Sequence, residues 1–313
     1  MIVYQELKSI EKDLGFSAKT LYGLSNNISA HYHNAFIPKS DGTQRKLSVP
    51  DLILKKVQKS ILDNILVNYP VSKYACAYTF GASVQKNATP HVGKEKILKL
   101  DIEGFFDHIL YSTVKDVVFF KEKFSEPIRI LLSMLCYHND VLPQGAPTSP
   151  AITNIIMRDF DEKVGEFCRE KGVCYTRYCD DMTFSGDFDE TPIIDFVKNE
   201  LKAYGLFLKN RKTVVIPNTK RQLVTGVVVN EKLNLTREYK KKVRQEMYYI
   251  KKFGLDEHLK AIGEKDKAHY VNSLKGRIAY ILQTIPGDKE FVSYKKALAK
   301  MWNCSAYRTN FQH

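Results

Sequence analysis

Residues 177–184 read RYCDDMTF and set two aspartates, Asp180 and Asp181, between two short runs of strand-forming residues. The pattern predicts a β-hairpin that carries both carboxylates at its tip. Like charges at this range disfavour each other's ionisation, and a cation between them reverses that effect. A bare Asp-Asp pair most often marks a solvated turn. The strands on either side, a third aspartate upstream and the basic charge of the chain favour a sheet with a metal site instead.

That third aspartate ends an apolar strand. The segment ILKLDIEGFF (97–106) is strand-like up to Asp101 and then turns. If this strand and the hairpin are neighbours in one sheet, the carboxylates of Asp101, Asp180 and Asp181 converge at its edge. Oxygen ligands with no Cys or His nearby favour Mg²⁺, or Mn²⁺ in its place, over zinc. Two such ions about 4 Å apart can clamp the attacking and leaving oxygens of a nucleotidyl transfer.

The composition is that of a basic globular protein. The chain has 313 residues, of which 44% are hydrophobic and 27% charged, and its net charge is +13. This excess favours a polyanionic partner such as nucleic acid, although a merely basic enzyme has the same composition. No apolar stretch is long enough to span a bilayer, and the start lacks the pattern of a signal peptide. The six cysteines form no C-x-x-C pair, so we expect reduced thiols in a cytoplasmic protein with no membrane partner.

The order of the elements predicts an α+β fold, with a mixed sheet and helices packed on one of its faces. The predicted elements are, in order, a hairpin over 35–50 around Asp41-Gly42, a helix at 52–66, the strand at 97–106, a helix from Ser149-Pro150 to Gly172, the hairpin around Asp180, a helix at 192–205, strands near 206–216 and 222–229, and a helical tail from Thr236.

Four motifs resemble those of reverse transcriptases, and they occur in the same order. The sequence YCDD (178–181) resembles the Y-x-D-D motif, and LKLDIEGFF (98–106) resembles the first palm motif. LPQGAPTSP (142–150) is similar to the Q-G-x-x-x-S-P motif, and GLFLKNRKT (205–213) to the palm motif that follows. The resemblance implies a right-hand polymerase fold with fingers, palm and a helical thumb.

Two further stretches are similar to the NAxxH and VTG signatures of bacterial retron reverse transcriptases. They are Asn87-Ala88-x-x-His91 and Val224-Thr225-Gly226. The resemblance covers roughly residues 35–285. It departs from the family at Cys179, where alanine is usual, and we expect activity to survive because both side chains are small. The implied domains are an N-terminal helical lead-in (1–34), fingers with part of the palm (35–96), palm with a fingers insertion (97–236) and a basic helical thumb (237–313).

The resemblance also implies the roles of the catalytic residues. Asp101, Asp180 and Asp181 would hold two Mg²⁺ ions, with the Ile102 carbonyl as a further ligand. Lys212 would be the general acid for the pyrophosphate leaving group, and Lys209 is a rival for that role.

The incoming dNTP has its own implied contacts. Phe106 would be the steric gate against a ribonucleotide 2′-hydroxyl, and its alternative is a core phenylalanine. Gln144 and Gly145 would line the nucleotide pocket. Arg45, assisted by Lys46, would clamp the triphosphate, because a guanidinium fork matches phosphate oxygens. Each of these basic residues could equally be a solvated surface residue.

The helical tail suits a duplex that is gripped through its phosphates. Between 237 and 277 there are twelve Lys and Arg against six Asp and Glu, and basic helices favour A-form backbones without base readout. An ordinary solvated surface is the alternative for any single lysine. The residues expected to contact RNA are Asn87, His91, Val224, Thr225, Gly226, Lys240, Lys241, Lys242 and Arg244.

The function implied by the family is an RNA-directed DNA polymerase. Retron relatives copy their own structured non-coding RNA from a guanosine 2′-hydroxyl, remain bound to the branched RNA–DNA product (msDNA) and act with an effector protein in anti-phage defence. Two alternatives stay open at this stage. One is another bacterial reverse transcriptase, of group II intron or diversity-generating type, and the other is an RNA-binding scaffold that restrains an effector.

Overall fold

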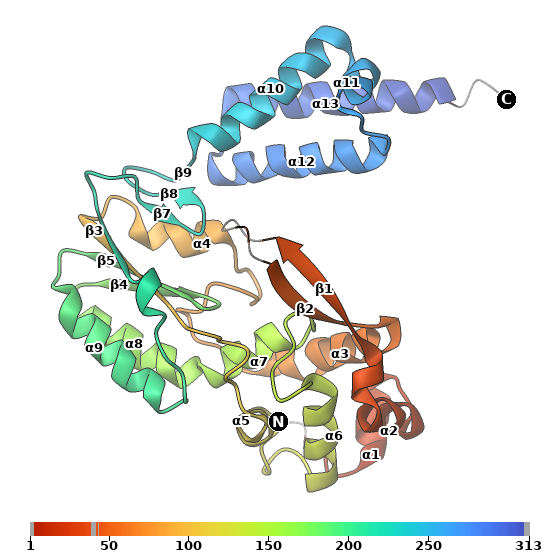
Figure 1. Cartoon of the computed structure of the whole chain (residues 1–313), viewed down its shortest axis with the longest axis vertical. Coiled ribbons are helices and arrows are strands. Elements are labelled where there is room, and N and C mark those ends of the chain that lie inside the picture. Colours follow the sequence, from red (N-terminus) through yellow and green to blue (C-terminus); the bar gives the residue numbers. More distant parts are fainter. Residues whose placement is uncertain (1–2, 39–41, 43, 310–313) are drawn as a thin grey trace. The chain divides into compact units, whose positions relative to one another are not determined.

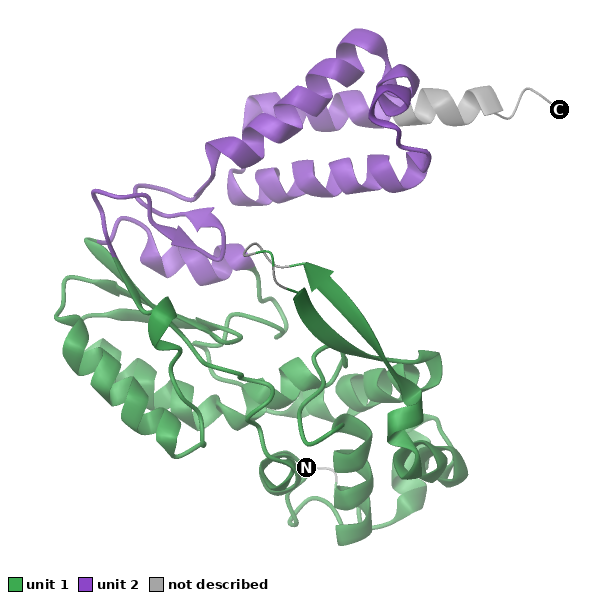
Figure 2. Cartoon of the chain, viewed as in Figure 1, with its two compact units in different colours: residues 1–83, 95–215 green, residues 84–94, 216–313 purple. Residues whose placement is uncertain are grey.

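The structure is a computed structural model that describes residues 3–38, 42 and 44–309 (Figure 1). The chain forms two compact units (Figure 2). Unit 1 contains the residues up to 83 together with 95–215, and unit 2 contains 84–94 together with the residues from 216 onward. Segment 84–94, which carries the first retron-like signature, therefore packs with the C-terminal part of the chain. The fingers, palm and thumb boundaries remain predictions.

A four-stranded sheet organises unit 1, in the order β4-β5-β3-β6. Its strands are β3 (Lys96–Asp101), β4 (Cys174–Tyr178), β5 (Asp181–Gly186) and β6 (Val214–Pro217), and the last two residues of β6 already belong to unit 2. The central strand β5 is antiparallel to both β3 and β4. Leu98, Leu100, Met182 and Phe184 are all buried, so the sheet lies inside the hydrophobic core of the unit. The hairpin predicted around Asp180 is confirmed.

Two helices pack on the sheet, α8 (Arg158–Glu170) and α9 (Glu190–Lys202) (Figure 1). Phe160 and Val164 of α8 and Val197 of α9 are fully buried against it. The single long helix predicted from Ser149 is wrong in one respect. It is divided into α7 (Ser149–Ile156) and α8, because the backbone at Met157 has φ −83° and ψ 2° and leaves the α-helical region.

The predicted hairpin near the N-terminus is also present, formed by β1 (Tyr32–Pro38) and β2 (Gln44–Pro50) in antiparallel register. Asp41 of its turn lies outside the described residues. The other helices of unit 1 are α1 (Leu7–Leu14), α2 (Ala18–Asn26), α3 (Leu52–Asn64), α5 (Tyr111–Thr113) and α6 (Glu126–Cys136), with 3₁₀ or π turns at Ile28–His31, Leu66–Asn68, Val114–Val118 and Asn210–Lys212.

Unit 2 joins a small sheet to a set of helices. The sheet has three two-residue strands in sequence order, β7 (Leu223–Val224), β8 (Val227–Val228) and β9 (Asn234–Leu235). Its helices are α4 (Val84–Ala88), a 3₁₀ turn at Thr89–His91, α10 (Arg237–Phe253), α11 (Leu255–Ile262), α12 (Lys267–Thr284) and α13 (Lys289–Thr309). The Thr236 side chain caps α10 by accepting from the Tyr239 N–H, as its sequence predicts.

The buried stripe predicted for α10 is confirmed, since Val243, Met247 and Ile250 are each at most 1% exposed. Among the helices that the structure describes, none has the length and apolarity needed to traverse a bilayer. The five cysteines with described side chains form no disulfide with one another.

Candidate active site

The strand pairing of unit 1 brings the three predicted carboxylates to one end of its sheet. Asp101 ends β3 and lies opposite Asp181, the first residue of β5, while Asp180 occupies the turn between β4 and β5. The main chain reinforces this arrangement. The Ile102 N–H donates to the Asp180 carbonyl at 3.1 Å, and the Lys209 N–H donates to the Asp101 carbonyl at 2.8 Å. The carboxylates thus come together because three segments hydrogen-bond at the same edge.

Crowding of the carboxylates shows in their proton affinities. Desolvation, followed by the charge of Asp180, raises the pKa of Asp181 to about 6, against a smaller opposing effect of Lys99. Desolvation and the charge of Asp101 likewise raise the pKa of Asp180. The site therefore carries more negative charge than its surroundings stabilise, which is the condition under which a cation binds.

Lys212 supplies part of the missing positive charge. Its ammonium forms an ion pair with the Asp101 carboxylate. Burial lowers the pKa of Lys212, but the hydrogen bond and charge of Asp101 outweigh burial and raise it. The rival Lys209 takes part through its main chain, since its carbonyl accepts from the Lys212 N–H at 2.8 Å. Of the two lysines, Lys212 is the one whose side chain contacts a predicted metal ligand.

The donor set fits Mg²⁺ chemically. All three side chains offer hard carboxylate oxygens, two at the ends of adjoining strands and one in the turn beside them, which suits Mg²⁺ or Mn²⁺ and not zinc. Within the described part of the chain, no three Cys, His, Asp or Glu side chains are already arranged to hold a metal ion. One Asp101 oxygen is bonded to Lys212 in this arrangement.

The predicted triphosphate clamp lies on β2. Arg45 pairs with Ile37 across the β1–β2 hairpin, and Lys46 pairs with Phe36. The charge of Arg45 acts on the carboxylates: burial and Asp101 raise the pKa of Asp180, and Arg45 lowers it. Lys46 lies near another group: after burial, its charge is the second cause that lowers the pKa of His138.

The predicted nucleotide loop is bound to the same hairpin. The Gln144 carbonyl accepts from the Ser48 N–H at 3.0 Å. Gly145 has φ +134°, and a Cβ there would lie 2.6 Å from the Ser48 carbonyl oxygen. The absence of a side chain at Gly145 therefore lets the loop backbone approach β2 closely. This contact joins the loop to the strand that carries Arg45.

Phe106 and Phe105 differ in exposure, as expected if Phe106 is the steric gate and Phe105 a core residue. Phe105 is 3% exposed, whereas Phe106 is only partly buried, with the two ring centroids 5.5 Å apart. The Phe106 carbonyl accepts from the Leu142 N–H at 3.1 Å. This bond links the turn after Asp101 to the start of the nucleotide loop.

In unit 2 the two retron-like signatures pack against each other. The Asn87 amide donates to the Thr225 hydroxyl at 3.4 Å, and the Gly93 N–H donates to the Val229 carbonyl at 2.9 Å. Thr225 and Gly226 form the turn between β7 and β8, both with positive φ (45° and 82°).

Burial corrects part of the expected RNA contact. Asn87, His91 and Val224 are 1%, 0% and 0% exposed, so their side chains have no surface to offer to RNA. Of the two signatures, Thr225 and Gly226 at the turn are the predicted contact residues that reach solvent.

The predicted basic residues of α10 divide into two kinds. The Lys240 ammonium donates to the Asn234 side-chain oxygen at 2.8 Å, and the Arg244 guanidinium pairs with Glu290 of α13 at 2.7 Å. Lys241 and Lys242 are exposed. The first two residues therefore make polar contacts within unit 2, and Lys241 and Lys242 are better suited to bind a phosphate.

Two residues near the site were not singled out from the sequence. Tyr78 has φ +56° and is 60% exposed, with its ring 6.4 Å from that of Tyr178 in the YCDD motif. Arg177 is fully buried beside Asp161. The sequence carries no signal for either contact, because both depend on segments that meet only in the folded sheet.

A family comparison agrees with the motifs. The family model for reverse transcriptase (RNA-dependent DNA polymerase) matches residues 37–244. The Retron Ec86 reverse transcriptase of Escherichia coli is 30% identical, over 79% of this chain and 79% of its own length. The chain belongs to the bacterial retron reverse transcriptases. Its fold is accordingly the right-hand polymerase fold, in an α+β chain.

Other relatives extend the comparison. The Retron Mx65 reverse transcriptase of Myxococcus xanthus is 31% identical over 85% of this chain, and the chain spans 64% of that relative's length. Among solved structures, a telomerase from Candida albicans in complex with a fragment of telomeric RNA matches with a TM-score of 0.47 at 12% identity. That match covers 86% of this chain and 66% of the telomerase chain.

Proposed function

We propose that this retron reverse transcriptase copies a structured RNA into DNA by two-metal nucleotidyl transfer from dNTPs. The observation that carries the proposal is the convergence of Asp101, Asp180 and Asp181 at one end of the sheet, with raised pKa values for Asp180 and Asp181. Mg²⁺ held by these three residues and the Ile102 carbonyl would neutralise developing charge on the reacting phosphate and activate the primer hydroxyl. Among the described residues, these four are the ones that we propose as Mg²⁺ ligands.

The residues around the carboxylates act on the nucleotide. Arg45, with Lys46 beside it, binds the triphosphate as a fork and a point charge. Gln144 and Gly145 place the loop against β2, and Phe106 rejects the ribose 2′-hydroxyl. Lys212, held in its protonated form beside Asp101, gives a proton to the leaving pyrophosphate.

The proposal also includes the primer, the product and the partner protein that the retron family implies. The primer is a guanosine 2′-hydroxyl of the retron's own non-coding RNA, the product is msDNA, and an effector protein completes an anti-phage system. Residues 35–96 form the fingers with part of the palm, 97–236 the palm with a fingers insertion, and 237–313 the thumb. The exposed lysines of α10 and the Thr225-Gly226 turn contact the RNA.

Replacement of a single carboxylate tests the reaction. Asp180→Asn and Asp181→Asn should each lower primer extension on an RNA template by more than about 100-fold, since the loss of even an outer partner of a metal ligand costs 10- to 100-fold. Asp187→Asn, an exposed site just beyond the far end of β5, makes the same change of charge and should leave activity within a few-fold of wild type. Extension by either catalytic variant at the control level would exclude the proposed mechanism.

The alternative of a pure RNA scaffold predicts a different result. In that case wild type would bind RNA yet extend no primer under any Mg²⁺ or Mn²⁺ concentration. RNA binding by Asp180→Asn should be nearly unchanged under both proposals, so the extension assay alone separates them.

A further inference from the structure

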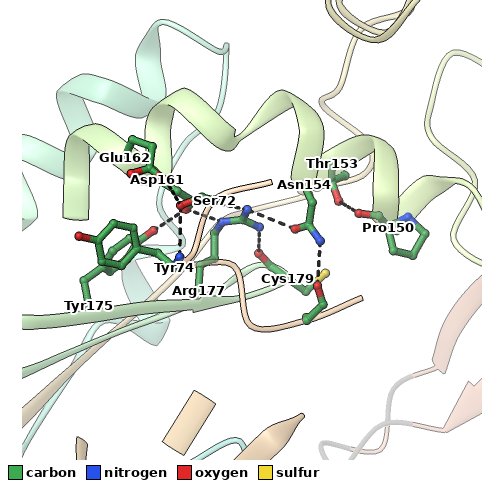
Figure 3. A network of polar contacts seen from close by, with 11 residues as sticks. Ser72, Tyr74, Pro150, Thr153, Asn154, Asp161, Glu162, Tyr175, Arg177 and Cys179 are labelled. Atoms are coloured by element: carbon green, nitrogen blue, oxygen red, sulfur yellow. Dashed lines mark hydrogen bonds and ion pairs between the residues drawn. The ribbon is translucent and has the colours of Figure 1, made fainter. Parts of the chain in front are cut away.

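A fully buried ion pair lies directly behind the catalytic turn. The guanidinium of Arg177, on β4, meets the Asp161 carboxylate of α8 through two hydrogen bonds of 2.8 and 2.6 Å, and both side chains are 0% exposed (Figure 3). Tyr175 donates its hydroxyl to the same carboxylate at 2.8 Å. Burial opposes the charge of Arg177, but Asp161 outweighs burial and raises the pKa of the guanidinium, so Arg177 stays charged.

Arg177 also reaches past its partner to the turn itself. Its Nη1 donates to the Cys179 carbonyl at 2.9 Å (Figure 3). Cys179 has φ +62°, a left-handed conformation that a residue with a side chain adopts only when its surroundings impose it. On the next residue, the Asp180 carbonyl accepts from Ile102. The turn that presents Asp180 is thus held through the Asp180 carbonyl by Ile102, the residue after β3, and through the preceding Cys179 carbonyl by Arg177.

Asn154 of α7 connects this contact to a second strained segment. Its side-chain oxygen accepts from Arg177 Nη2 at 3.3 Å, and its amide donates to the Ala77 carbonyl at 2.8 Å (Figure 3). Ala77 precedes Tyr78, which has φ +56°. The main chain of the same segment pairs with Arg177, through Arg177 N–H to the Tyr74 carbonyl and Cys76 N–H to the Arg177 carbonyl, both at 2.8 Å.

Stability alone does not explain this cluster. A buried ion pair is weak support for a fold, because desolvation offsets its attraction and well-packed apolar residues often replace it without loss. What apolar residues cannot supply is a donor to the Cys179 carbonyl or to the Ala77 carbonyl. The Cys179 carbonyl belongs to a left-handed residue that precedes Asp180 in the chain. The Ala77 carbonyl precedes the left-handed Tyr78, whose ring lies near that of Tyr178. Asp180 and Tyr178 both belong to the YCDD motif.

We propose that Arg177, Asp161 and Asn154 are positioning residues for the metal-binding carboxylates. Arg177 and Asn154 hold the turn in the conformation that directs Asp180 toward Asp101, and Asp161 keeps Arg177 charged and oriented. The proposal rests on the proposed function for the identity of the reaction. It concerns ligand geometry, however, and can be tested by cation binding alone.

Apolar replacement of the ion pair separates positioning from stability. The triple variant Asp161→Leu, Tyr175→Phe, Arg177→Met removes both charges of the ion pair. It also removes the Tyr175 hydroxyl, which would otherwise lose the Asp161 carboxylate as its acceptor. We expect its melting temperature to equal or exceed that of wild type. Binding of Tb³⁺ is measured by tyrosine-sensitised luminescence, with the signal of Asp180→Asn taken as the background. The Tb³⁺ affinity of the triple variant should fall about 10- to 100-fold, the usual effect of losing an outer partner of a metal ligand. Primer extension should fall similarly through kcat, with little change in the KM for dNTP.

A milder pair of variants covers the case in which the triple variant does not fold. Asn154→Ala removes the link to Ala77 and leaves the ion pair intact. Thr153→Ala is its matched control, because Thr153 is the preceding residue of α7, is 1% exposed like Asn154, and donates its hydroxyl to the Pro150 carbonyl of its own helix at 2.8 Å (Figure 3). Asn154→Ala should weaken Tb³⁺ binding and raise the Mg²⁺ midpoint for activity several-fold, whereas Thr153→Ala should change neither.

The outcomes distinguish this proposal from the proposed function. Wild-type Tb³⁺ affinity in a folded triple variant, or equal effects of Asn154→Ala and Thr153→Ala, would overturn the positioning role. If wild type extended no primer, the proposed function would fail, yet the Tb³⁺ comparison would still decide whether the cluster places the carboxylates.

Discussion

Gly145 is the residue at which the predicted nucleotide loop meets the β1–β2 hairpin. Gly145→Ala would press a Cβ to 2.6 Å from the Ser48 carbonyl oxygen at φ +134°. We expect the loop to shift, with a loss of about 1–3 kcal/mol in the free energy of unfolding and a raised KM for dNTP. Gly81→Ala is the control, because Gly81 also has positive φ (+70°) but an added Cβ there meets nothing within 4 Å. Its cost should be only about 1 kcal/mol, with KM unchanged. Equal KM effects would remove Gly145 from the nucleotide pocket.

Phe106 and its neighbour allow a second single-residue test. Phe106→Val should admit ribonucleotides, because a smaller side chain leaves room for the 2′-hydroxyl, and the ratio of dNTP to rNTP incorporation measures this. Phe105→Val serves as the comparison, since Phe105 is 3% exposed in the core. It should cost about 2 kcal/mol or more in stability while discrimination stays the same. Unchanged discrimination in Phe106→Val would place the gate elsewhere.

At the scale of elements, α10 has a buried side and an exposed basic side. Lys241, Lys242 and Lys252 are exposed, and the Lys252 ammonium lies 5.1 Å from the Phe253 ring centroid. If these lysines contact RNA phosphates, the triple Lys→Gln variant should flatten the slope of log K against log salt by roughly 2 to 3. A filter-binding salt titration with an RNA hairpin of unrelated sequence measures it, because phosphate contacts carry no sequence information.

The control for α10 is an equal change of charge in unit 1. Lys171, Lys198 and Lys202 are exposed at the end of α8 and along α9. Their triple Lys→Gln variant should keep the wild-type salt slope. If the two triple variants flatten the slope equally, net charge and not the surface of α10 governs RNA binding.

At the scale of the whole molecule, the two units should respond to pH in opposite directions. In metal-free protein the folded state raises the pKa of Asp181 to about 6, chiefly through desolvation, with Asp180, Asp101 and Lys99 facing it. The stability from this group is present below its unfolded pKa and is lost as pH rises through 6. In unit 2, burial and then the charge of Lys94 lower the pKa of His91 to about 3. That contribution is complete above about pH 6.5 and is lost as pH falls.

Hydrogen exchange in EDTA, corrected for intrinsic rates, measures both responses. Between pH 7.5 and 5, protection of β3 and β5 should rise and protection of α4 and β7 should fall. Other groups titrate in the same range, so variants identify the source: Asp181→Asn should flatten the response of unit 1 alone, and His91→Gln that of unit 2 alone. A response of the same sign in both units, insensitive to these variants, would contradict the assignment.

Much of the architecture was readable from local sequence. The hairpin around Asp180, the β1–β2 hairpin, the Thr236 cap and the buried stripe of α10 each depend on residues close together in the chain, through turn chemistry, capping and periodicity. The meeting of Asp101 with the Asp180-Asp181 pair followed from the assumption that two strands are neighbours in one sheet. For that reason the carboxylates of the candidate site were predictable.

Tertiary structure alone decided what each remaining side chain touches. The sequence could not show that Asn87 and His91 are buried beside Thr225, that Arg244 pairs with Glu290, or that Met157 divides a helix. Nor could it show that Arg177 and Asp161 meet behind the catalytic turn. Local patterns are encoded by neighbours in the chain, whereas these contacts depend on which distant surfaces the packed core brings together, and burial then determines whether a charge binds a ligand or another residue.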